Sequence, residues 1–150
     1  MKMLVLASVF AGLTGPALAS DDVLRVAAEG DVATTADALE EVVRGAGATV
    51  FARVDHGAGA ASVEMELPPA ELLIFGNPAL GTPAMQENAL AGLTLPMRVL
   101  VYEDENGQVW LAYENPAEML GDLEGIDDEA GYVAKMTGAL KKLTGKAAGG

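Results

Sequence analysis

The sequence predicts an α+β protein, a two-layer sandwich in which one mostly antiparallel sheet carries helices on one face. Three observations predict it. Short β-branched and aromatic runs recur along the chain, longer segments place apolar residues at helical spacing, and an Asn-Gly pair at 106–107 joins two strand-like runs. In chain order the expected elements are β-α-β-β-β-β-α.

The first half of the domain supplies a strand, a helix and two further strands. Residues 23–28, VLRVAA, form the first expected strand. A helix follows, with Thr34 as the expected N-cap and Asp37 as its capping partner, and it ends at a Gly-Ala-Gly sequence. Residues 49–54 are β-branched and aromatic. The unbroken apolar run at 71–75 predicts a strand buried on both faces and placed centrally in the sheet.

The second half supplies a short helix, the hairpin and a closing helix. Pro83 can begin a helix over 84–90. Residues 97–104 and 108–114 flank Asn106-Gly107, a pair whose favoured turn needs positive φ at both positions. The closing helix is expected to start at Asp127 and Asp128 and to carry lysines at its negative end. Its expected apolar face consists of Tyr132, Val133, Met136, Leu140 and Leu143.

Residues 1–19 predict a signal peptide. Lys2 provides a positive start, residues 3–13 are largely apolar, and Ala17-Leu18-Ala19 is a small-residue cleavage pattern. The apolar run is shorter than the roughly 20 residues that a stable membrane anchor needs. We therefore expect cleavage near Ala19-Ser20 and a periplasmic or secreted protein without a stable membrane anchor.

The remainder is expected to be one domain over residues 20–146, followed by a flexible tail over 147–150. The composition excludes several chemistries for this domain. The chain has no cysteine, which excludes thiolate catalysis, thiolate metal ligands and covalent haem attachment. Its formal charge of −13 becomes −13 − 1 = −14 once Lys2 leaves with the signal peptide. Such an acidic surface repels nucleic acid, so we expect no nucleic-acid partner.

Residues 76–82, GNPALGT, have the glycine spacing of a phosphate-binding P-loop but lack its cation. Thr82 stands where the phosphate-binding lysine belongs, and no lysine occurs between Lys2 and Lys135. Local structure explains the same residues, because Asn77 can cap a turn and proline fixes φ. The stretch is therefore interpreted as a tight corner beside a candidate site.

His56 is the single histidine, and it directly follows Asp55. Adjacent strand residues point to opposite faces, so Asp55 does not readily orient His56 as a triad carboxylate would, and the nearby nucleophile would be Ser62. A hydrolase-like enzyme using His56 as a general base therefore stays an alternative, as does a haem or copper protein that pairs His56 with a methionine. No catalytic residue or metal ligand is assigned, and the cofactor is left unknown.

Three longer stretches together resemble the domain of unknown function 302 (DUF302) family. They are TVFARVDHGAGAA at 49–61, ELLIFGNPALGTPAM at 71–85 and LTLPMRVLVYEDENGQVWLAYENP at 93–116, and the similarity covers about residues 24–143. The most specific elements are Asp55-His56, Phe75-Gly76-Asn77-Pro78 with Gly81-Thr82, Leu95-Pro96, and Tyr113 with Pro116. The sequence departs from the common family pattern at Glu64, Ala89 and Thr94.

The resemblance implies a small two-layer α/β fold that a C-terminal helix closes, and it implies a homodimer. It implies no activity, because the family is named for the lack of one. We therefore expect an exported, non-enzymatic domain that binds an unidentified small molecule or a protein partner. The polar residues that follow two neighbouring expected strands, Asp55 and His56 with Asn77 and Thr82, are expected to converge at one sheet end. Tyr113 of the hairpin is a further candidate ligand-binding residue, since aromatic side chains there can line a pocket.

Overall fold

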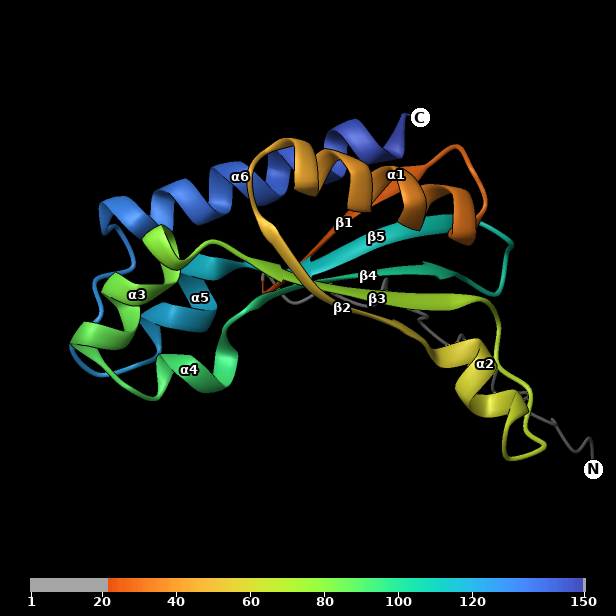
Figure 1. Ribbon diagram of the computed structural model, residues 1–150, viewed down its shortest axis with the longest axis horizontal. Helices are drawn as coiled ribbons and strands as arrows, with labels where there is room; N and C mark the ends of the chain where they lie inside the picture. The colour runs from red at the N-terminus through yellow and green to blue at the C-terminus, as the bar shows by residue number, and fades with distance from the viewer. Residues whose placement is uncertain (1–21, 150) are drawn as a thin grey trace, which may run out of the picture.

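The described part of the chain, residues 22–149 of a computed structural model, forms a five-stranded antiparallel sheet with helices packed on it (Figure 1). The strand order is β1-β5-β4-β3-β2. The elements are β1 (Val23–Ala28), α1 (Val32–Gly45), β2 (Thr49–Asp55), α2 (His56–Ala61), β3 (Ala70–Gly76), α3 (Pro78–Glu87), α4 (Ala91–Thr94), β4 (Met97–Glu103), β5 (Val109–Glu114), α5 (Pro116–Gly121) and α6 (Gly131–Ala148). The predicted α+β class is confirmed. Helices α2, α4 and α5 lie between the predicted elements, and α3 overlaps the short helix predicted over 84–90. The predicted signal peptide lies outside the described residues.

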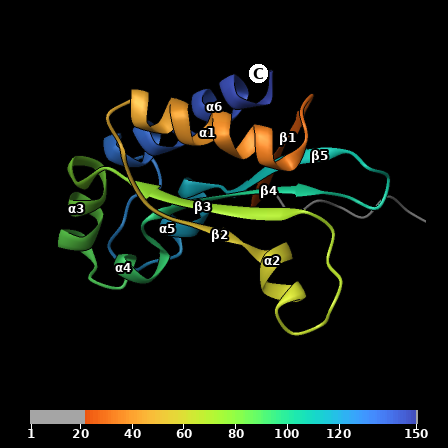
Figure 2. The same cartoon turned by 45° about the vertical axis from the view of Figure 1, so that its right-hand side comes forward.

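The main core lies between the sheet and two helices, α1 and α6, which lie side by side on one face (Figures 1 and 2). Strand alternation selects the residues that face these helices. In β4, Val99 and Val101 are buried, whereas Leu100 between them is half-buried on the opposite face. On α1, Leu39 and Val43 lie one turn apart and are both buried. These two periodicities explain why the sequence forms two layers.

The opposite sheet face carries side chains that are half-buried or exposed in the described part of the chain. Leu72 of β3 pairs with Leu100, and Leu100 pairs with Ala112 of β5, so the three form an apolar row across the strands. The prediction that residues 71–75 are buried on both faces was wrong for this reason, although β3 does lie inside the sheet. Helices α3, α4 and α5 gather instead at one end of the sheet, where they form a second cluster with the start of α6.

Helix α1 begins at Val32, two residues before the predicted cap. Asp31 is the N-cap, and its Oδ1 accepts the N–H of Thr34 at 2.7 Å. This bond holds the pKa of the Asp31 carboxyl below its usual value. The predicted cap at Thr34 with its partner Asp37 was therefore wrong, because Asp31 caps the helix three residues earlier and Thr34 lies inside its first turn. Asp37 instead accepts a hydrogen bond from Arg53 of β2.

The hairpin between β4 and β5 is confirmed, but its turn differs from the predicted one. The last strand pair is Glu103 with Val109, and Gly107 has a φ of 77° whereas Asn106 does not have positive φ. Asp104 closes the loop, since its carboxylate accepts the N–H groups of Asn106 and Gln108 and the indole N–H of Trp110. These bonds, led by the one from Trp110, lower the pKa of Asp104. A tight two-residue turn would forgo them.

Helix α6 starts later and ends later than predicted. Asp127 accepts the N–H of Glu129 in a turn that precedes the helix, which begins at Gly131. At the other end, Ala147 and Ala148 are helical and only 2% and 7% exposed, and the carbonyl of Ala148 accepts the N–H of Glu29 at 3.0 Å. The predicted tail over 147–150 was therefore wrong for residues 147 and 148, because the last turn of α6 packs against the end of β1.

Candidate functional site

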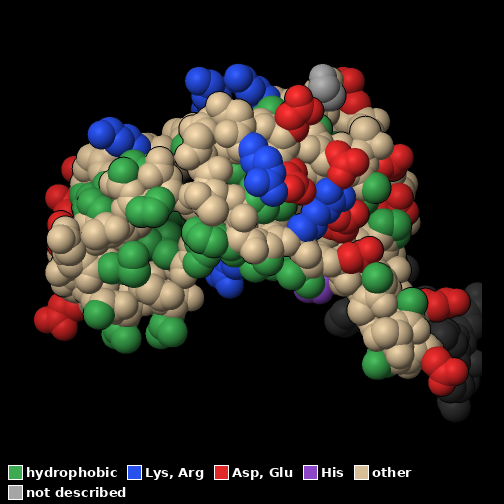
Figure 3. Space-filling model, in the orientation of Figure 1, with side chains coloured by type: hydrophobic (Ala, Val, Ile, Leu, Met, Phe, Trp, Pro, Cys, Tyr) green, Lys and Arg blue, Asp and Glu red, His purple; other side chains and the backbone are tan. Residues whose placement is uncertain are grey.

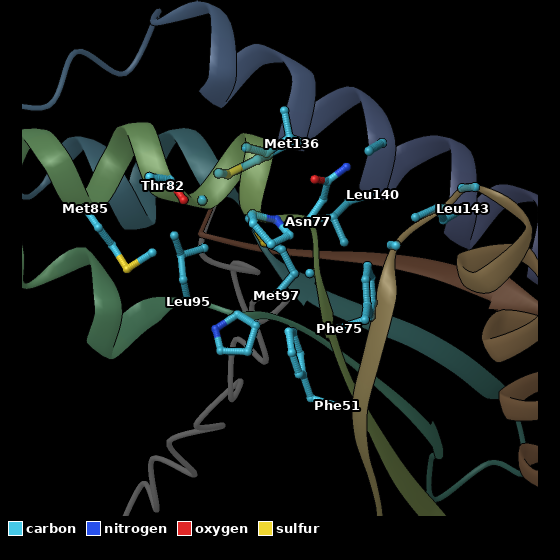
Figure 4. Close-up of a pocket in the computed structure, with 18 of the residues that line it drawn as sticks. Phe51, Phe75, Asn77, Thr82, Met85, Leu95, Met97, Met136, Leu140 and Leu143 are labelled. Carbon is cyan, nitrogen blue, oxygen red and sulfur yellow. The ribbon is translucent and has the colours of Figure 1, made fainter.

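A pocket of about 460 Å³ lies at the end of the sheet where β3 leads into α3 (Figure 4). Strands β2 and β3, helices α3 and α6, and the start of β4 contribute its wall. In Figure 4, Phe51 and Phe75 stand on one side of the pocket and Met85 stands on the other, with α6 along the top. The large apolar side chains on the wall are Phe51, Phe75, Leu80, Met85, Leu95, Met97, Met136, Leu140 and Leu143.

The pocket lies where the two hydrophobic clusters of the protein meet. Phe75, Leu140 and Leu143 belong to the main core, and Met136 belongs to the cluster at the α3–α5 end. Met97 packs against both clusters. The gap between the two clusters is therefore walled by side chains from both, which gives the pocket its apolar character.

The turn from β3 into α3 gives the pocket its shape. Gly76 ends the strand, and a Cβ at this position would lie 3.3 Å from Cε2 of Phe51 and 3.3 Å from Cβ of Pro96. The glycine therefore allows β2 and the segment before β4 to close against the end of β3. Asn77 follows as the N-cap of α3, with Oδ1 accepting the N–H of Ala79 at 2.9 Å, and Pro78 occupies the first helical position. The predicted start of this helix at Pro83 was wrong, because capping by Asn77 begins it five residues earlier.

A polar contact ties α3 to α6, the two helices that flank the pocket. The hydroxyl of Tyr132 donates a hydrogen bond of 2.5 Å to the carboxylate of Glu87. Burial, together with this neighbouring carboxylate, raises the pKa of Tyr132 to about 12. The phenol therefore stays protonated and keeps donating at neutral pH.

The wall of the pocket is uncharged. Of the described residues, those that line it include no aspartate, glutamate, lysine, arginine or histidine. The carbonyl of Asn77 accepts the N–H groups of Leu80 and Gly81 at 2.9 and 3.0 Å, so the first-turn amides of α3 are already used within the protein. The polar side-chain groups that remain on the wall are the amino group of Asn77 and the hydroxyl of Thr82.

The predicted site residues divide between the two ends of the sheet. Asn77 and Thr82 line the pocket, as the tight-corner interpretation allowed. Asp55 pairs with Glu71 at the opposite end of the antiparallel β2–β3 ladder, and Asn77 lies six residues beyond Glu71. At roughly 3.3 Å per residue this is about 20 Å, too far for one small-molecule site. The predicted convergence of Asp55 and His56 with Asn77 and Thr82 was therefore wrong, because antiparallel neighbours end at opposite edges.

Asp55 and His56 begin a short helix instead of an open glycine-rich stretch. Oδ1 of Asp55 accepts the N–H of Ala58 at 2.8 Å, which makes Asp55 the N-cap of α2. His56 is the first residue of α2 and is exposed. Its use as a general base, or as a ligand for haem or copper, stays a prediction.

Tyr113 lies in the main core. It pairs with Leu24 of β1, is 6% exposed, and belongs to the same buried cluster as Leu111. It does not line the pocket. Tyr113 is therefore a core residue, and the prediction that it binds a ligand finds no support from this pocket.

Sequence reasoning missed most of the residues that make the pocket. Met136 was predicted only as part of the apolar face of the closing helix, and Phe51 and Met97 were only strand residues. The usable signal was the apolar face of α6, since Met136, Leu140 and Leu143 were all predicted to lie on it. Nothing local in the sequence brings that face to Gly76 and Asn77.

Residues 22–149 contain neither a metal-binding cluster of side chains nor a membrane-spanning helix. No group of three or more histidine, aspartate or glutamate side chains within this range is placed to hold a metal ion. No helix in the described range is both long and apolar enough to cross a membrane.

Fold and site together define a small two-layer α+β domain with an apolar pocket at one end of its sheet. The sequence pattern of the family described as "Domain of unknown function DUF302" matches residues 24–143, and the chain belongs to this family. The predicted resemblance is thereby confirmed. A crystal structure of an uncharacterized conserved DUF302 protein from Bacillus stearothermophilus is similar, with a TM-score of 0.68 over 86% of this chain and 97% of that one. At 18% identity this similarity supports the fold.

Curated relatives share a closer similarity over a shorter segment. A protein of Brucella suis biovar 1 (strain 1330) named "Fluoride-specific ion channel FluC 1" is 49% identical over 86 residues, which is 57% of this chain and 34% of that protein. Proteins named FluC 1 in Brucella abortus and FluC 2 in Brucella melitensis match with the same identity over 32% of their length. The match thus spans about a third of these relatives.

Proposed function

We propose that this protein is a non-enzymatic domain that binds a small, largely apolar molecule in the pocket between α3 and α6. The observation that carries the proposal is the pocket itself. Its volume of about 460 Å³ falls within the range of small-molecule sites, about 300–1,000 Å³, and such sites combine a hydrophobic wall with a few polar groups. The signal peptide predicted for residues 1–19 would place this function in the periplasm or outside the cell.

The wall also has the adaptability that ligand sites use. Met85, Met97 and Met136 reach it from three different elements. Methionine is unbranched and polarizable, so its side chain can follow ligands of different shape. Met85 is 41% exposed, which leaves a flexible side chain near the solvent.

Fluoride, for which the curated relatives are named, does not suit this pocket. A small anion leaves water only where cationic side chains or free N–H groups replace its hydration. The described wall carries no cationic side chain, and the first amides of α3 are occupied by Asn77. We therefore assign the pocket to an apolar molecule.

The test uses the fluorescence of N-phenyl-1-naphthylamine, an uncharged apolar dye, with two variants of α6. Ala139 lines the pocket, so Ala139→Phe fills part of it, whereas Ala134 on the same helix is exposed and outside the pocket. We expect the wild type and Ala134→Phe to bind the dye alike and Ala139→Phe to bind it at least about tenfold more weakly. Thermal unfolding of both variants controls for overpacking, which costs about 1–3 kcal/mol. Equal dye binding by Ala139→Phe, or none by the wild type, would refute the pocket as the site.

We further propose that the protein associates with a second copy of itself through the open sheet face. This face consists of the half-buried side chains of Leu72, Ile74, Leu100, Tyr102, Trp110 and Ala112, which lie opposite α1 and α6. Its charged groups are largely paired within the chain. Arg98 bonds Glu114 at 2.7 Å, and the guanidinium of Arg25 lies 5.8 Å from the ring centre of Trp110 and bonds the hydroxyl of Tyr102. Two copies of an acidic protein can therefore meet here without opposing like charges.

The open sheet face is smaller than a standard protein–protein interface, so a second surface of the protein has to contribute to the dimer contact. Five strands of about six residues cover roughly 24 by 20 Å, or about 500 Å². A standard interface buries about 800 Å² on each partner. The remainder can come from α2 and the segment after it, which project beyond the sheet (Figure 1) and expose Val63, Met65 and Leu67. Figure 3 shows the molecule hollowed below the sheet, between this projection and the α3–α4 end.

Sedimentation of the wild type and two arginine variants tests this association. Leu100 lies in the middle of the open sheet face, so Leu100→Arg places two unpaired cations at the centre of a symmetric contact. We expect the wild type to sediment at twice the mass of the purified chain and Leu100→Arg at the mass of a single chain. Ala134→Arg is the control, because Ala134 is exposed on α6, which covers the opposite face of the sheet. A monomeric wild type, or a dimeric Leu100→Arg variant, would contradict the proposal.

A further inference from the structure

We infer that the pocket selects an uncharged amphiphile, a molecule with an apolar body and a neutral hydrogen-bond acceptor at one end that meets Asn77. The inference rests on the proposed function and names the chemical class of its ligand. Alcohols, esters, amides and ketones with a chain or ring system as the body belong to this class.

The first step is the exclusion of charge. The chain carries 31 charged residues, 22 acidic and 9 basic, yet none of its described ones lines the pocket. A carboxylate, phosphate or ammonium group that entered would lose its hydration and gain no partner of opposite sign. Charged amphiphiles are therefore disfavoured at the wall, whatever the length of their apolar part.

The second step concerns the N-terminus of α3, which borders the pocket and would ordinarily attract an anion. Pro78 has no N–H, Ala79 donates to the side chain of Asn77, and Leu80 and Gly81 donate to the Asn77 carbonyl. The donors that bind anions at other helices are thus already used here. An anionic head group would have to displace them.

The third step is the orientation of the Asn77 amide. Its N-cap role requires an acceptor, because a backbone N–H can bond only to the amide oxygen. The oxygen is therefore held against α3, and the amino group is the part left for a ligand. An amino group donates and does not accept, so its partner on the ligand is an acceptor such as a carbonyl, ether or hydroxyl oxygen.

The pocket wall opposite the Asn77 amino group imposes little selection on the shape of the ligand's apolar body. Met85, Met97 and Met136 can rearrange around different apolar bodies. The pocket should consequently discriminate by charge and by the presence of an acceptor more than by chain length or branching.

Competition against bound N-phenyl-1-naphthylamine tests the charge selection. The competitors are 1-dodecanol, dodecanoate and dodecyltrimethylammonium at pH 8, which share one chain length and differ in head-group charge. We expect dodecanol to displace half of the dye at a concentration about tenfold below that of either ion. Equal competition by an ionic chain overturns the inference while leaving the proposed function intact. Absence of dye binding by the wild type overturns both.

Two matched substitutions test the role of the Asn77 amino group. Asn77→Asp keeps a capping acceptor and removes the amino group, and aspartate is as good an N-cap as asparagine. Asn115 is its control, since it caps α5 through the N–H of Ala117, precedes a proline as Asn77 does, and lies outside the pocket. The probe is 2-dodecanone, whose carbonyl only accepts hydrogen bonds. We expect Asn77→Asp to weaken its binding about tenfold relative to dye binding, and Asn115→Asp to leave the ratio of the two affinities unchanged. If Asn77→Asp unfolds at the normal temperature and leaves the ratio of 2-dodecanone affinity to dye affinity unchanged, the inference is overturned.

Discussion

Leu39→Ala is expected to lower the free energy of unfolding by about 3 kcal/mol, within the range of about 2–5 kcal/mol for truncating a buried leucine. Leu39 is 0% exposed on α1 and belongs to the same core cluster as Val99 and Val101 of the central strand. The loss has two parts, the transfer free energy of the removed methyl groups and the cavity that a helix and a hydrogen-bonded sheet cannot collapse to fill. Urea denaturation of the wild type and the variant measures it.

The control for this loss is Leu93→Ala. Leu93 is 81% exposed on α4, so its truncation removes almost no buried surface and should change the stability by less than about 0.5 kcal/mol. A loss below about 1 kcal/mol for Leu39→Ala would mean that α1 is not packed on the sheet as described.

Arg53→Ala is expected to lower the free energy of unfolding by about 2 kcal/mol. This value lies between the loss of about 0–1 kcal/mol for an exposed ion pair and that of about 3–5 kcal/mol for breaking a buried one. The guanidinium of Arg53 in β2 bonds Glu71 of β3 and Asp37 of α1, so it joins the two layers. The carboxylate of Glu71, which is the main cause, raises the pKa of Arg53 above its ordinary value. Without Arg53, the carboxylate of Glu71 has no cationic partner, and because its side chain is only 14% exposed, water compensates for that loss poorly.

A double-mutant cycle with Arg53→Ala and Glu71→Ala isolates the pair itself and should give a coupling of about 1 kcal/mol that weakens in 1 M salt. Arg44→Ala is the matched control. Arg44 pairs with Glu40 one turn away on the same helix and its side chain is 59% exposed, so its loss should cost less than about 0.5 kcal/mol. If the two arginine variants lost equal stability, the link between β2 and α1 would contribute nothing beyond a surface pair.

The position of the pocket follows from how the protein divides its apolar residues. The main core is formed by the sheet with α1 and α6, and the second cluster by α3, α4 and α5 with the start of α6. Among residues 22–149, only α6 and Met97 take part in both. Helix α6, with 18 residues, is long enough to contact both clusters. Its side chains do not fill the space between the clusters, and the space that remains beside α6 is the pocket.

Local sequence signals predicted what depends on neighbouring residues. Strand alternation and the helical spacing of Val133, Met136 and Leu140 predicted the element types and the buried face of α6. The Asn-Gly pair predicted the hairpin between β4 and β5. Side-chain hydrogen bonds at helix starts and turns were less predictable, because Asp31 and Thr34 are both common N-cap residues and spacing alone does not choose between them. Asp31 caps α1, and Asp104 closes the hairpin loop.

The candidate site depended on contacts between distant residues. Antiparallel pairing of β2 with β3 separated His56 from Asn77, although both follow strands that are neighbours in sequence. The same pairing brought Phe51 beside Gly76, and the packing of α6 brought Leu143 to the same wall. The sequence by itself determined the class of fold and the order of the five strands with α1 and α6, because each follows from the chemistry of a few consecutive residues. Only the tertiary structure decided which residues share a pocket, because that depends on strand direction and on how two hydrophobic clusters close against one helix.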